Sequence, residues 1–490
     1  MYSSAVEELD VLVLGGGPAG VVAALRAARL GARTALVTRD DLGGMAANDG
    51  PVPVRTLAHA ARLMREARQL ARYGIDAGEI TLDYQRLLAR VRGVTSDVRR
   101  HALLREELLR SGVTVVEHAG TGRFVDSHVI ESDNAPRLRS RSVIVCTGGV
   151  SRRLALPGFE LTSTHSDAWR LTSAPESLLV IGAGATGVQV ASIFNAFGSR
   201  VTLFEAARRV LMSEDEQVSA AMSTALQSSW VRVVEDAGSI ERFEQSPAGV
   251  RVVYTKGGAQ DYIDAAVAVV AIGWVANTDG LNLAAAGVRT DARGYVEVDS
   301  QMRTTAPGVY AAGDVTGHVM VVHEAVREAY LAATNATLGR TDALPAEVSP
   351  LGSFTDPEYA SIGLTEAKAR ESHDVVVATE RFDSLPRPII DGRPAGFCKL
   401  IADRQKHAIL GCHVVGERAV ELAQLAAIAV ASGMTVEQLA LVPFSFPTYA
   451  NALGRAAIRA ASELDLRVDG LAPGAWLGAP VDAGGTVITP

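Results

Sequence analysis

Short apolar runs that alternate with glycine turns dominate the first forty residues of the chain. Residues 10–14 predict a buried strand, and the glycine-rich residues 15–20 predict a tight turn. Residues 21–30 favour a helix, Gly31 ends it, and residues 33–38 predict a second strand. The pattern is that of a compact strand–turn–helix–strand unit.

The same pattern recurs later in the chain. It predicts a strand at 177–181, a turn at 182–187, a helix at 188–197 and a strand at 200–205. A repeat of this whole arrangement is more specific than one glycine turn. The chain therefore contains two units of the kind that binds dinucleotides.

The remaining pattern predicts two further regions. Amphipathic helices are expected at 56–72 and 84–111, between the two units. From about residue 348 onward, strand-like runs at 396–401 and 409–415 surround a helix at 419–432. This second region indicates a C-terminal α+β domain.

Composition narrows the class of protein. Of 490 residues, 48% are apolar and 21% charged, as in a globular protein with a large core. The net charge of -8 argues against nucleic acid or an anionic membrane as a partner. The polar N-terminus and the short apolar runs predict neither a signal peptide nor a membrane span.

The cysteines are sparse. Cys146, Cys398 and Cys412 form no closely spaced pair, and an odd count fits a reducing compartment, so we expect a cytoplasmic protein. We expect all three to be small buried hydrophobes without a redox role. No metal site is expected.

Each glycine of the two G-x-G-x-x-G turns has its own physical role. The first allows the turn, the second lets the backbone approach a pyrophosphate, and the third lets helix and strand pack closely. The phosphates then lie at a helix N-terminus, where free N–H groups favour anions. The first turn contributes Gly15, Gly17, Pro18, Ala19 and Gly20, and the second contributes Gly182, Gly184 and Gly187.

The residue after the second strand differs between the two units. In the later unit it is Glu205, which accepts hydrogen bonds from an adenosine ribose and repels a 2′-phosphate. This favours NADH over NADPH, although Arg208 and Arg209 lie close enough to reach a phosphate. In the first unit the position is Thr38, whose hydroxyl is a weaker ribose partner than a carboxylate.

Several further motifs resemble those of the flavoprotein disulfide reductases, the group that contains dihydrolipoamide dehydrogenase and mercuric reductase. Residues 146–148 with 156–158, 309–314, 320–324 and 354–358 are similar to that family's motifs in the same order. The resemblance covers roughly residues 9–465. It implies an α/β fold of two Rossmann-like domains and a C-terminal α+β dimerisation domain, in a homodimer whose active sites are completed across the interface.

The resemblance also implies FAD in the first unit and NADH or NADPH in the second. Asp314 matches the family residue that binds the ribityl chain, and His323 matches the stretch whose backbone lies near the flavin pyrimidine ring. Other expected cofactor contacts are Gly43, Gly44, Arg55, Thr147, Gly148, Gly273 and Gly313. The implied domains are residues 1–155 with 280–340 for FAD, 156–279 for NAD(P), and 345–470 for the interface, followed by a tail at 471–490.

The catalytic motifs depart from the family. Ala46 and Pro51 occupy the positions of its two redox cysteines. The C-terminal histidine and its orienting acid are replaced by Phe446 and Asn451. Without a thiolate or an imidazole to protonate it, the family's disulfide chemistry is not available, and neither is reduction of a soft metal ion.

A third change lies beside the expected flavin position. The family's lysine–glutamate pair is here Arg55 and Gln189, which keeps the positive charge without the carboxylate. Such a cation should stabilise an anionic reduced flavin, although drift after loss of the disulfide would give the same residues.

Removal of both sulfurs leaves a space that Met45, Ala46 and Pro51 would line, with Phe446, Tyr449 and Asn451 across the dimer. A flat, weakly polar acceptor such as a quinone suits this space, unless the side chains fill it. We therefore expect an NAD(P)H:acceptor oxidoreductase that works without a disulfide. The alternatives are a reductase component that passes electrons to a partner protein, and a non-catalytic flavoprotein.

Overall fold

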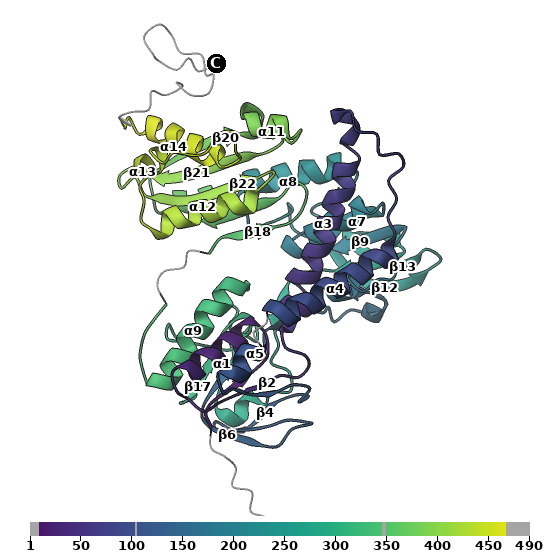
Figure 1. Cartoon of the computed structure of the whole chain (residues 1–490). Helices are drawn as coiled ribbons and strands as arrows, with labels where there is room; N and C mark the ends of the chain where they lie inside the picture. Colours follow the sequence, from purple (N-terminus) through teal and green to yellow (C-terminus); the bar gives the residue numbers. More distant parts are fainter. Residues whose placement is uncertain (1–8, 103–104, 345–348, 467–490) are drawn as a thin grey trace, which may run out of the picture. The chain divides into compact units, whose positions relative to one another are not determined.

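The structure is a computed structural model that describes residues 9–102, 105–344 and 349–466 (Figure 1). These residues form two compact units. The first comprises the described parts of 1–176, 242–251 and 266–347. The second comprises 177–241, 252–265 and the described residues from 349 onward.

A seven-stranded sheet is the centre of the first unit, in the order β3-β2-β1-β6-β5-β4 with β17 also paired to β6. The pairs among β3, β2, β1, β6 and β17 are parallel, whereas β4, β5 and β6 pair antiparallel. Their bounds are β1 (Leu9–Leu14), β2 (Thr34–Val37), β3 (Thr114–Val116), β4 (Arg123–Asp126), β5 (Val129–Glu131), β6 (Leu138–Val145) and β17 (Val309–Ala311).

Burial on both faces of this sheet explains its continuous apolar strands. All four residues of β2 are buried, and so are the last four of β1. On one face α1 (Pro18–Arg29) and α9 (Val322–Leu338) lie side by side (Figure 1). Gly15 follows β1 directly, so the glycine turn lies at the carboxyl end of the parallel strands, where α/β folds bind ligands.

The other elements of the first unit are mostly short. The two-stranded pair β7–β16 is antiparallel, and β8 pairs in parallel with β15. The helices are α2 (Gly44–Asn48), α3 (Pro51–Ala67), α4 (Tyr84–Ala102), α5 (Arg105–Arg110), α6 (His165–Ala168), η1 (Leu70–Tyr73), η2 (Phe159–Leu161), η3 (Leu283–Ala286) and η4 (Asp314–Thr316). The short strands are β7 (Gly149–Ser151), β8 (Ser163–Thr164), β15 (Val267–Val270) and β16 (Trp274–Ala276).

The second unit repeats the strand–turn–helix–strand arrangement. Strands β9 (Ser177–Ile181), β10 (Arg200–Phe204) and β11 (Arg232–Val234) are parallel, and α7 (Ala185–Ala196) connects β9 to β10. Helix α8 (Glu216–Ser228) connects β10 to β11. A separate three-stranded sheet contains β12 (Ser239–Ser246), β13 (Gly249–Lys256) and β14 (Ala259–Ala265).

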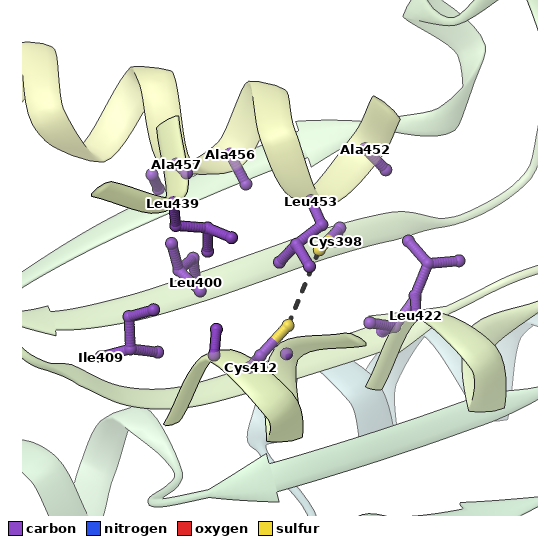
Figure 2. Packing of buried hydrophobic residues seen from close by; sticks show 14 of the residues in the cluster. Cys398, Leu400, Ile409, Cys412, Leu422, Leu439, Ala452, Leu453, Ala456 and Ala457 are labelled. Atoms are coloured by element: carbon purple, nitrogen blue, oxygen red, sulfur yellow. Dashed lines mark hydrogen bonds between the residues drawn. The ribbon is translucent and has the colours of Figure 1, made fainter. Parts of the chain in front are cut away.

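A five-stranded antiparallel sheet, in the order β18-β19-β22-β21-β20, forms the C-terminal part of the second unit. Helices α12 and α14 pack on one of its faces, around Cys398 and Cys412 (Figure 2). The strands are β18 (Leu351–Ser353), β19 (Tyr359–Gly363), β20 (Val375–Arg381), β21 (Phe397–Asp403) and β22 (Ile409–Val415). The helices are α10 (Glu366–Arg370), η5 (Phe382–Ser384), α11 (Pro386–Ile390), α12 (Ala419–Ala431), α13 (Val436–Ala440) and α14 (Asn451–Glu463).

The predicted α/β class and both glycine-turn units are confirmed, and the differences concern helix ends. Helix α1 begins at Pro18 and not at residue 21, since proline is well accommodated in the first turn. The helix expected at 56–72 begins earlier, at Pro51, for the same reason. The region expected as a helix at 84–111 is helical at 84–102 and at 105–110, and residues 103–104 and the predicted tail at 471–490 lie outside the described residues. Within the described residues, no helix is both long and apolar enough to span a bilayer.

Candidate active site

The first glycine turn connects β1 to α1. Its geometry distinguishes the glycines that the backbone requires from the one that only a bound ligand would require. Gly15 has a φ of +110°, which side chains rarely adopt. A Cβ atom on Gly20 would lie 1.7 Å from the Gly15 carbonyl oxygen. Both glycines are therefore required by the backbone itself.

Gly17 differs from its two neighbours in the motif. A Cβ atom there would meet no described atom closer than 3.9 Å, and its φ of -74° is open to any residue. The fold alone thus has no need of glycine at this position. The space in front of Gly17, at the N-terminus of α1, fits a bound pyrophosphate that must approach the backbone closely.

Segments far apart in the sequence gather around this turn. The Gly43 N–H donates to the Gly16 carbonyl at 2.7 Å. A Cβ atom on Gly16 would lie 2.8 Å from Thr38 Oγ1, and one on Gly313 would lie 3.3 Å from the Ala19 side chain. The structure therefore brings together the predicted cofactor positions at 15–20, Thr38, 43–44 and Gly313. His323 lies in the exposed first turn of α9.

Asp314 follows Gly313 and is half-buried. Burial, with a smaller contribution from the charge of Glu328, raises the pKa of Asp314 to about 6. Among the described residues, no lysine or arginine pairs with it. Such a carboxyl group is poorly satisfied by the protein alone and suits the hydroxyl groups of a ribityl chain.

Glu328 binds the backbone of the residue before Asp314, and the sequence analysis did not single it out. Its Oε2 accepts a 2.7 Å hydrogen bond from the Gly313 N–H, and its Oε1 lies 2.8 Å from His318 Nδ1. The available signal was a pair of glutamates, Glu324 and Glu328, one helical turn apart on the otherwise apolar face of α9. A buried carboxylate of this kind requires partners that only the folded chain provides.

A second orphaned polar atom lies in the same unit. The Thr147 hydroxyl oxygen is buried without a hydrogen-bond partner among the described residues. Next to it, Asn277 Nδ2 donates to the Thr147 carbonyl at 3.1 Å, and the Asn277 N–H donates to the Gly148 carbonyl at 2.9 Å. Together with the open space at Gly17 and the half-buried Asp314, this orphaned hydroxyl fits a large polar cofactor such as FAD.

The second glycine turn, between β9 and α7, has the same geometry. A Cβ atom on Gly187 would lie 1.8 Å from the Gly182 carbonyl oxygen, whereas one on Gly184 would meet no described atom within 4 Å. Gly273, which we expected among the cofactor contacts, belongs to the first unit, and its carbonyl accepts a hydrogen bond from the Arg152 N–H at 3.0 Å.

Glu205 anchors the second turn. Its Oε2 accepts from the Ala183 N–H at 2.6 Å, and its Oε1 accepts from the Ala207 N–H at 2.8 Å. A carboxylate has further lone pairs and can still accept from a ribose. Arg209 donates to the carbonyls of Leu211, Met212 and Glu214, each at 3.1 Å, so its guanidinium is committed to the backbone.

The segment at 43–55, which carries the expected catalytic positions Ala46 and Pro51, contains a short helix followed by a longer one. Ala46 is half-buried in α2, and Pro51 is exposed as the first residue of α3. Gly50 separates the helices, and a Cβ atom there would lie 3.2 Å from the Met45 carbonyl oxygen. Arg55 lies on the exposed side of α3.

Gln189, the predicted counterpart of Arg55, is engaged within the second unit. Its Oε1 accepts from the Ser353 hydroxyl at 3.2 Å and from the Phe354 N–H at 3.4 Å. The side chain therefore links α7 to β18 and the residue that follows it.

The three residues expected from the C-terminal motif lie in different environments. Phe446 is 54% exposed, whereas Tyr449 is 6% exposed in the core of the C-terminal domain. The Tyr449 hydroxyl donates to Asp391 at 3.1 Å, and Asn451 Oδ1 accepts from the Thr448 N–H at 3.1 Å. The phenol and the amide oxygen are thus used inside their own domain, and only the aromatic ring of Phe446 is presented at the surface.

The three cysteines are buried and free, as the sequence predicts. Burial raises the pKa of Cys146 far above its usual range, so this thiol is not ionised at neutral pH. The sulfur atoms of Cys398 and Cys412 lie 3.7 Å apart in an apolar core formed by leucine and alanine side chains (Figure 2). The three cysteines therefore serve as packing residues, and the segment at 43–55 contains no cysteine.

A buried histidine cluster also escaped the sequence analysis. Ser151 Oγ lies 2.6 Å from His165 Nδ1, and Ser166 Oγ lies 3.1 Å from His165 Nε2. The Ser166 hydroxyl then donates to Asp49, which belongs to the altered segment between Ala46 and Pro51. Residues 164–167 do match a helix-capping pattern, but no local signal connects Ser166 to a residue more than a hundred positions earlier.

Comparison with known proteins identifies the family to which the chain belongs. The model of the pyridine nucleotide-disulphide oxidoreductases matches residues 9–329, and the model of their dimerisation domain matches residues 349–457. The chain belongs to the pyridine nucleotide-disulphide oxidoreductase family. Members of this family use FAD and NAD(P)H, and this chain is an FAD- and NAD(P)-dependent oxidoreductase of that kind.

Individual relatives support this assignment. The chain is 33% identical over 461 residues to dihydrolipoyl dehydrogenase of Geobacillus stearothermophilus, covering 93% of this chain and 96% of that protein. It is 31% identical to mercuric reductase of Lysinibacillus sphaericus, covering 92% and 82% respectively. Among solved structures, a Cu(II) complex of the HOCl-induced flavoprotein disulfide reductase RclA from Escherichia coli has the same fold, with a TM-score of 0.81 at 24% identity over 92% of this chain and 99% of that one.

Proposed function

We propose that the protein is an NAD(P)H:acceptor oxidoreductase that works without a redox disulfide and reduces a quinone-like or other organic acceptor. The observation that carries this proposal is the sequence of the 43–55 segment, where Ala46 and Pro51 replace both thiols that disulfide exchange requires. The bound FAD would supply a ring that accepts a hydride from NAD(P)H and passes the electrons on.

The residues that would hold FAD are those of the first turn and its surroundings. The N-terminus of α1 favours the pyrophosphate, and Gly17 leaves room for it. Asp314 would accept hydrogen bonds from ribityl hydroxyls, and the orphaned Thr147 hydroxyl would gain a partner. The Thr147 hydroxyl is buried without a partner among the described residues, so this contact would satisfy it.

We further propose NADH as the preferred donor. Glu205 places a negative charge beside the second turn, where it would accept from the ribose and repel a 2′-phosphate. Arg209 donates to three backbone carbonyls, which removes one of the two arginines that could favour NADPH. The other, Arg208, is exposed and lies 3.5 Å from Glu216.

The proposed acceptor site and the proposed homodimer rest on the C-terminal domain. Phe446 is exposed, and so are Ile389, Ile390, Ile428 and Leu441 of the same domain. Burial of such side chains is what a second copy would provide, and the matched dimerisation domain supports this interpretation. Light scattering at several concentrations should give twice the chain mass, and a monomer at micromolar concentration would contradict the homodimer.

An anaerobic titration with NADH and then NADPH, followed by visible absorbance, tests the main proposal. We expect one equivalent of NADH to bleach the bound flavin without a thiolate–flavin charge-transfer band, and soluble quinones to restore the colour. Bleaching without quinone turnover would favour the reductase that serves a partner protein. Flavin that neither donor reduces would favour the non-catalytic flavoprotein.

A cysteine-free variant tests the disulfide-free mechanism directly. Replacement of Cys146, Cys398 and Cys412 by alanine removes every thiol of the chain at a cost of about 1 kcal/mol of stability per site. We expect the folded variant to keep quinone turnover within about twofold of the wild type. A loss of turnover that exceeds the loss of folded protein would reveal a thiol-dependent step.

A further inference from the structure

The four-residue chain Ser151–His165–Ser166–Asp49, named here the histidine relay, has a defined hydrogen-bond order. The single proton of the Ser166 hydroxyl is donated to Asp49, so Ser166 Oγ must accept from His165 Nε2–H. In the neutral ring, Nδ1 is then the acceptor, and the Ser151 hydroxyl donates to it. Every donor in the relay therefore points toward Asp49.

The surroundings keep this order in place. The His165 ring is 4% exposed, and its centroid lies 4.5 Å from that of Trp274. Burial lowers the pKa of His165 below its usual value, which the charges of Asp49 and Asp167 oppose and that of Arg170 reinforces. The ring is accordingly neutral at physiological pH and able to take up and release one proton.

One end of the relay lies in the 43–55 segment, and the other lies close to solvent. Asp49 lies between Ala46 and Pro51, the positions that the redox cysteines occupy in the family. Its other oxygen lies 3.2 Å from Arg170 Nη2. Ser151, at the opposite end, is half-buried and is followed by two exposed arginines, so solvent protons can reach it.

The relay also borders the predicted flavin site. Ser151 belongs to β7, where it is paired with Trp274 of β16. Two residues earlier on β7, a Cβ atom on Gly149 would lie 3.4 Å from the Asp314 side chain. The relay thus connects the strand beside the ribityl-binding carboxyl group to the altered catalytic segment.

Reduction of a quinone requires a proton besides the hydride. The balance is NADH plus one proton plus quinone, giving NAD⁺ and hydroquinone, and the family's histidine that could move a proton is replaced by Phe446. We propose, on the basis of the proposed function, that the histidine relay carries a solvent proton from Ser151 to Asp49, which donates it to the acceptor oxygen. The transfer leaves His165 protonated at Nδ1 and Ser151 with a new proton from solvent. The ring must then return to the Nε2–H tautomer, by rotation or by proton exchange, before the next turnover.

The test compares acceptors that differ in their need for protons. Asp49→Asn keeps an oxygen that can accept from Ser166 but removes the transferable proton. We expect benzoquinone turnover to fall at least about tenfold and its pH profile to flatten, because general acid catalysis is lost. Reduction of ferricyanide, which takes up an electron without a proton, should change by less than about twofold, as should flavin bleaching by NADH.

Asp167→Asn is the matched control. Asp167 lies beside His165, raises its pKa as Asp49 does, and accepts hydrogen bonds at the N-terminus of α6, but it is outside the relay. Asparagine preserves an acceptor for these bonds. We expect this control to keep the wild-type ratio of quinone to ferricyanide turnover.

The outcomes separate the relay from the proposed function. Equal quinone turnover in wild type and Asp49→Asn would refute the relay alone. Absence of quinone turnover in the wild type would refute both. The tautomer of His165 gives a readout that does not depend on turnover: ¹⁵N NMR of the holoprotein, assigned with His165→Gln, should show the neutral ring protonated at Nε2. Protonation at Nδ1 would reverse the order of the relay and overturn the proposal.

Discussion

The two glycine turns share one backbone geometry but differ in the polar group that follows the next strand, and we propose different ligands for them. Gly17 and Gly184 have the same φ of -74° and ψ values of -178° and -176°. The third glycine of each turn packs against the first at a distance that excludes any side chain. The turns differ at the end of the next strand, where one has the buried hydroxyl of Thr38 and the other the carboxylate of Glu205.

The comparison separates two kinds of requirement. Backbone contacts fix the turn, whatever ligand is bound, and these are equal in both units. The charge at the end of the second strand differs between the two units, and we propose that it acts on the ligand. A substitution can therefore destabilise the turn, weaken cofactor binding while the turn stays folded, or change only the preference between NADH and NADPH.

The largest effect should come from Gly187→Ala in the second turn. Its Cβ would overlap the Gly182 carbonyl, and we expect the free energy of unfolding to fall by about 3 kcal/mol. Gly184→Ala is the control, because its Cβ enters open space. It should lower the free energy of unfolding by less than about 0.5 kcal/mol and weaken NADH binding at least about tenfold. Urea unfolding and NADH titration measure the two quantities, and equal unfolding curves would contradict the division of roles.

Asp314→Asn should have opposite effects on binding and stability. Because the folded protein holds this carboxyl group with a pKa of about 6, against 3.8 for an unperturbed aspartate, the folded state binds more protons than the unfolded state between these values. Its contribution to stability is therefore lost as pH rises from about 4 to about 6 and stays lost above. We expect the FAD-free variant to be more stable than the wild type by about 1–3 kcal/mol at pH 8 and to bind FAD more weakly.

Urea unfolding of the FAD-free proteins at pH 5 and pH 8 checks this sign. The advantage of the variant should be larger at pH 8, where the wild-type carboxyl group must ionise in its half-buried position. A larger advantage at pH 5 would mean that the folded chain favours the carboxylate, and the proposed role of Asp314 as a partner of ribityl hydroxyls would lose its support.

Glu205→Gln should alter donor preference by a smaller amount. Removal of the negative charge weakens repulsion of a 2′-phosphate, and we expect the preference for NADH over NADPH in kcat/KM to fall about tenfold. Glu216→Gln is the matched control, since it removes the exposed carboxylate beside Arg208 without touching the turn. A preference unchanged in Glu205→Gln, or changed equally in both variants, would contradict the assigned role.

The smallest effect should be that of Thr38→Val in the first unit. Loss of one neutral hydrogen bond to the ribose should weaken FAD binding by about 1 kcal/mol. Thr34→Val, on the same strand, removes a hydroxyl that donates to the Ala32 carbonyl at 3.0 Å, away from the turn. Isothermal titration of FAD into the FAD-free proteins should distinguish the two, and equal weakening would place the Thr38 hydroxyl outside the site.

Prediction from the sequence succeeded where the signal is local. The strand at 177–181 and the glycine turn after it follow from apolar runs and glycines that are adjacent in the chain, and β9 has the predicted bounds. The helix starts were less accurate: α1, α3 and α7 begin at Pro18, Pro51 and Ala185, each three to five residues before the predicted start. The C-terminal domain was predicted from its pattern of strand-like runs and a helix. The burial of Tyr449 was not predicted, because its hydrogen-bond partner Asp391 is distant in sequence.

The sequence by itself determined the α/β class, both glycine turns and the absence of cysteine from the 43–55 segment. It also determined that the residue after the second strand is Thr38 in one unit and Glu205 in the other. Only the tertiary structure decided which polar groups are satisfied. It placed the half-buried Asp314 near the charge of Glu328, left the Thr147 hydroxyl without a partner among the described residues and joined Asp49 to His165 through Ser166. The physical reason is that glycine turns depend on neighbouring residues, whereas desolvation and hydrogen bonding depend on segments that meet only when the chain folds.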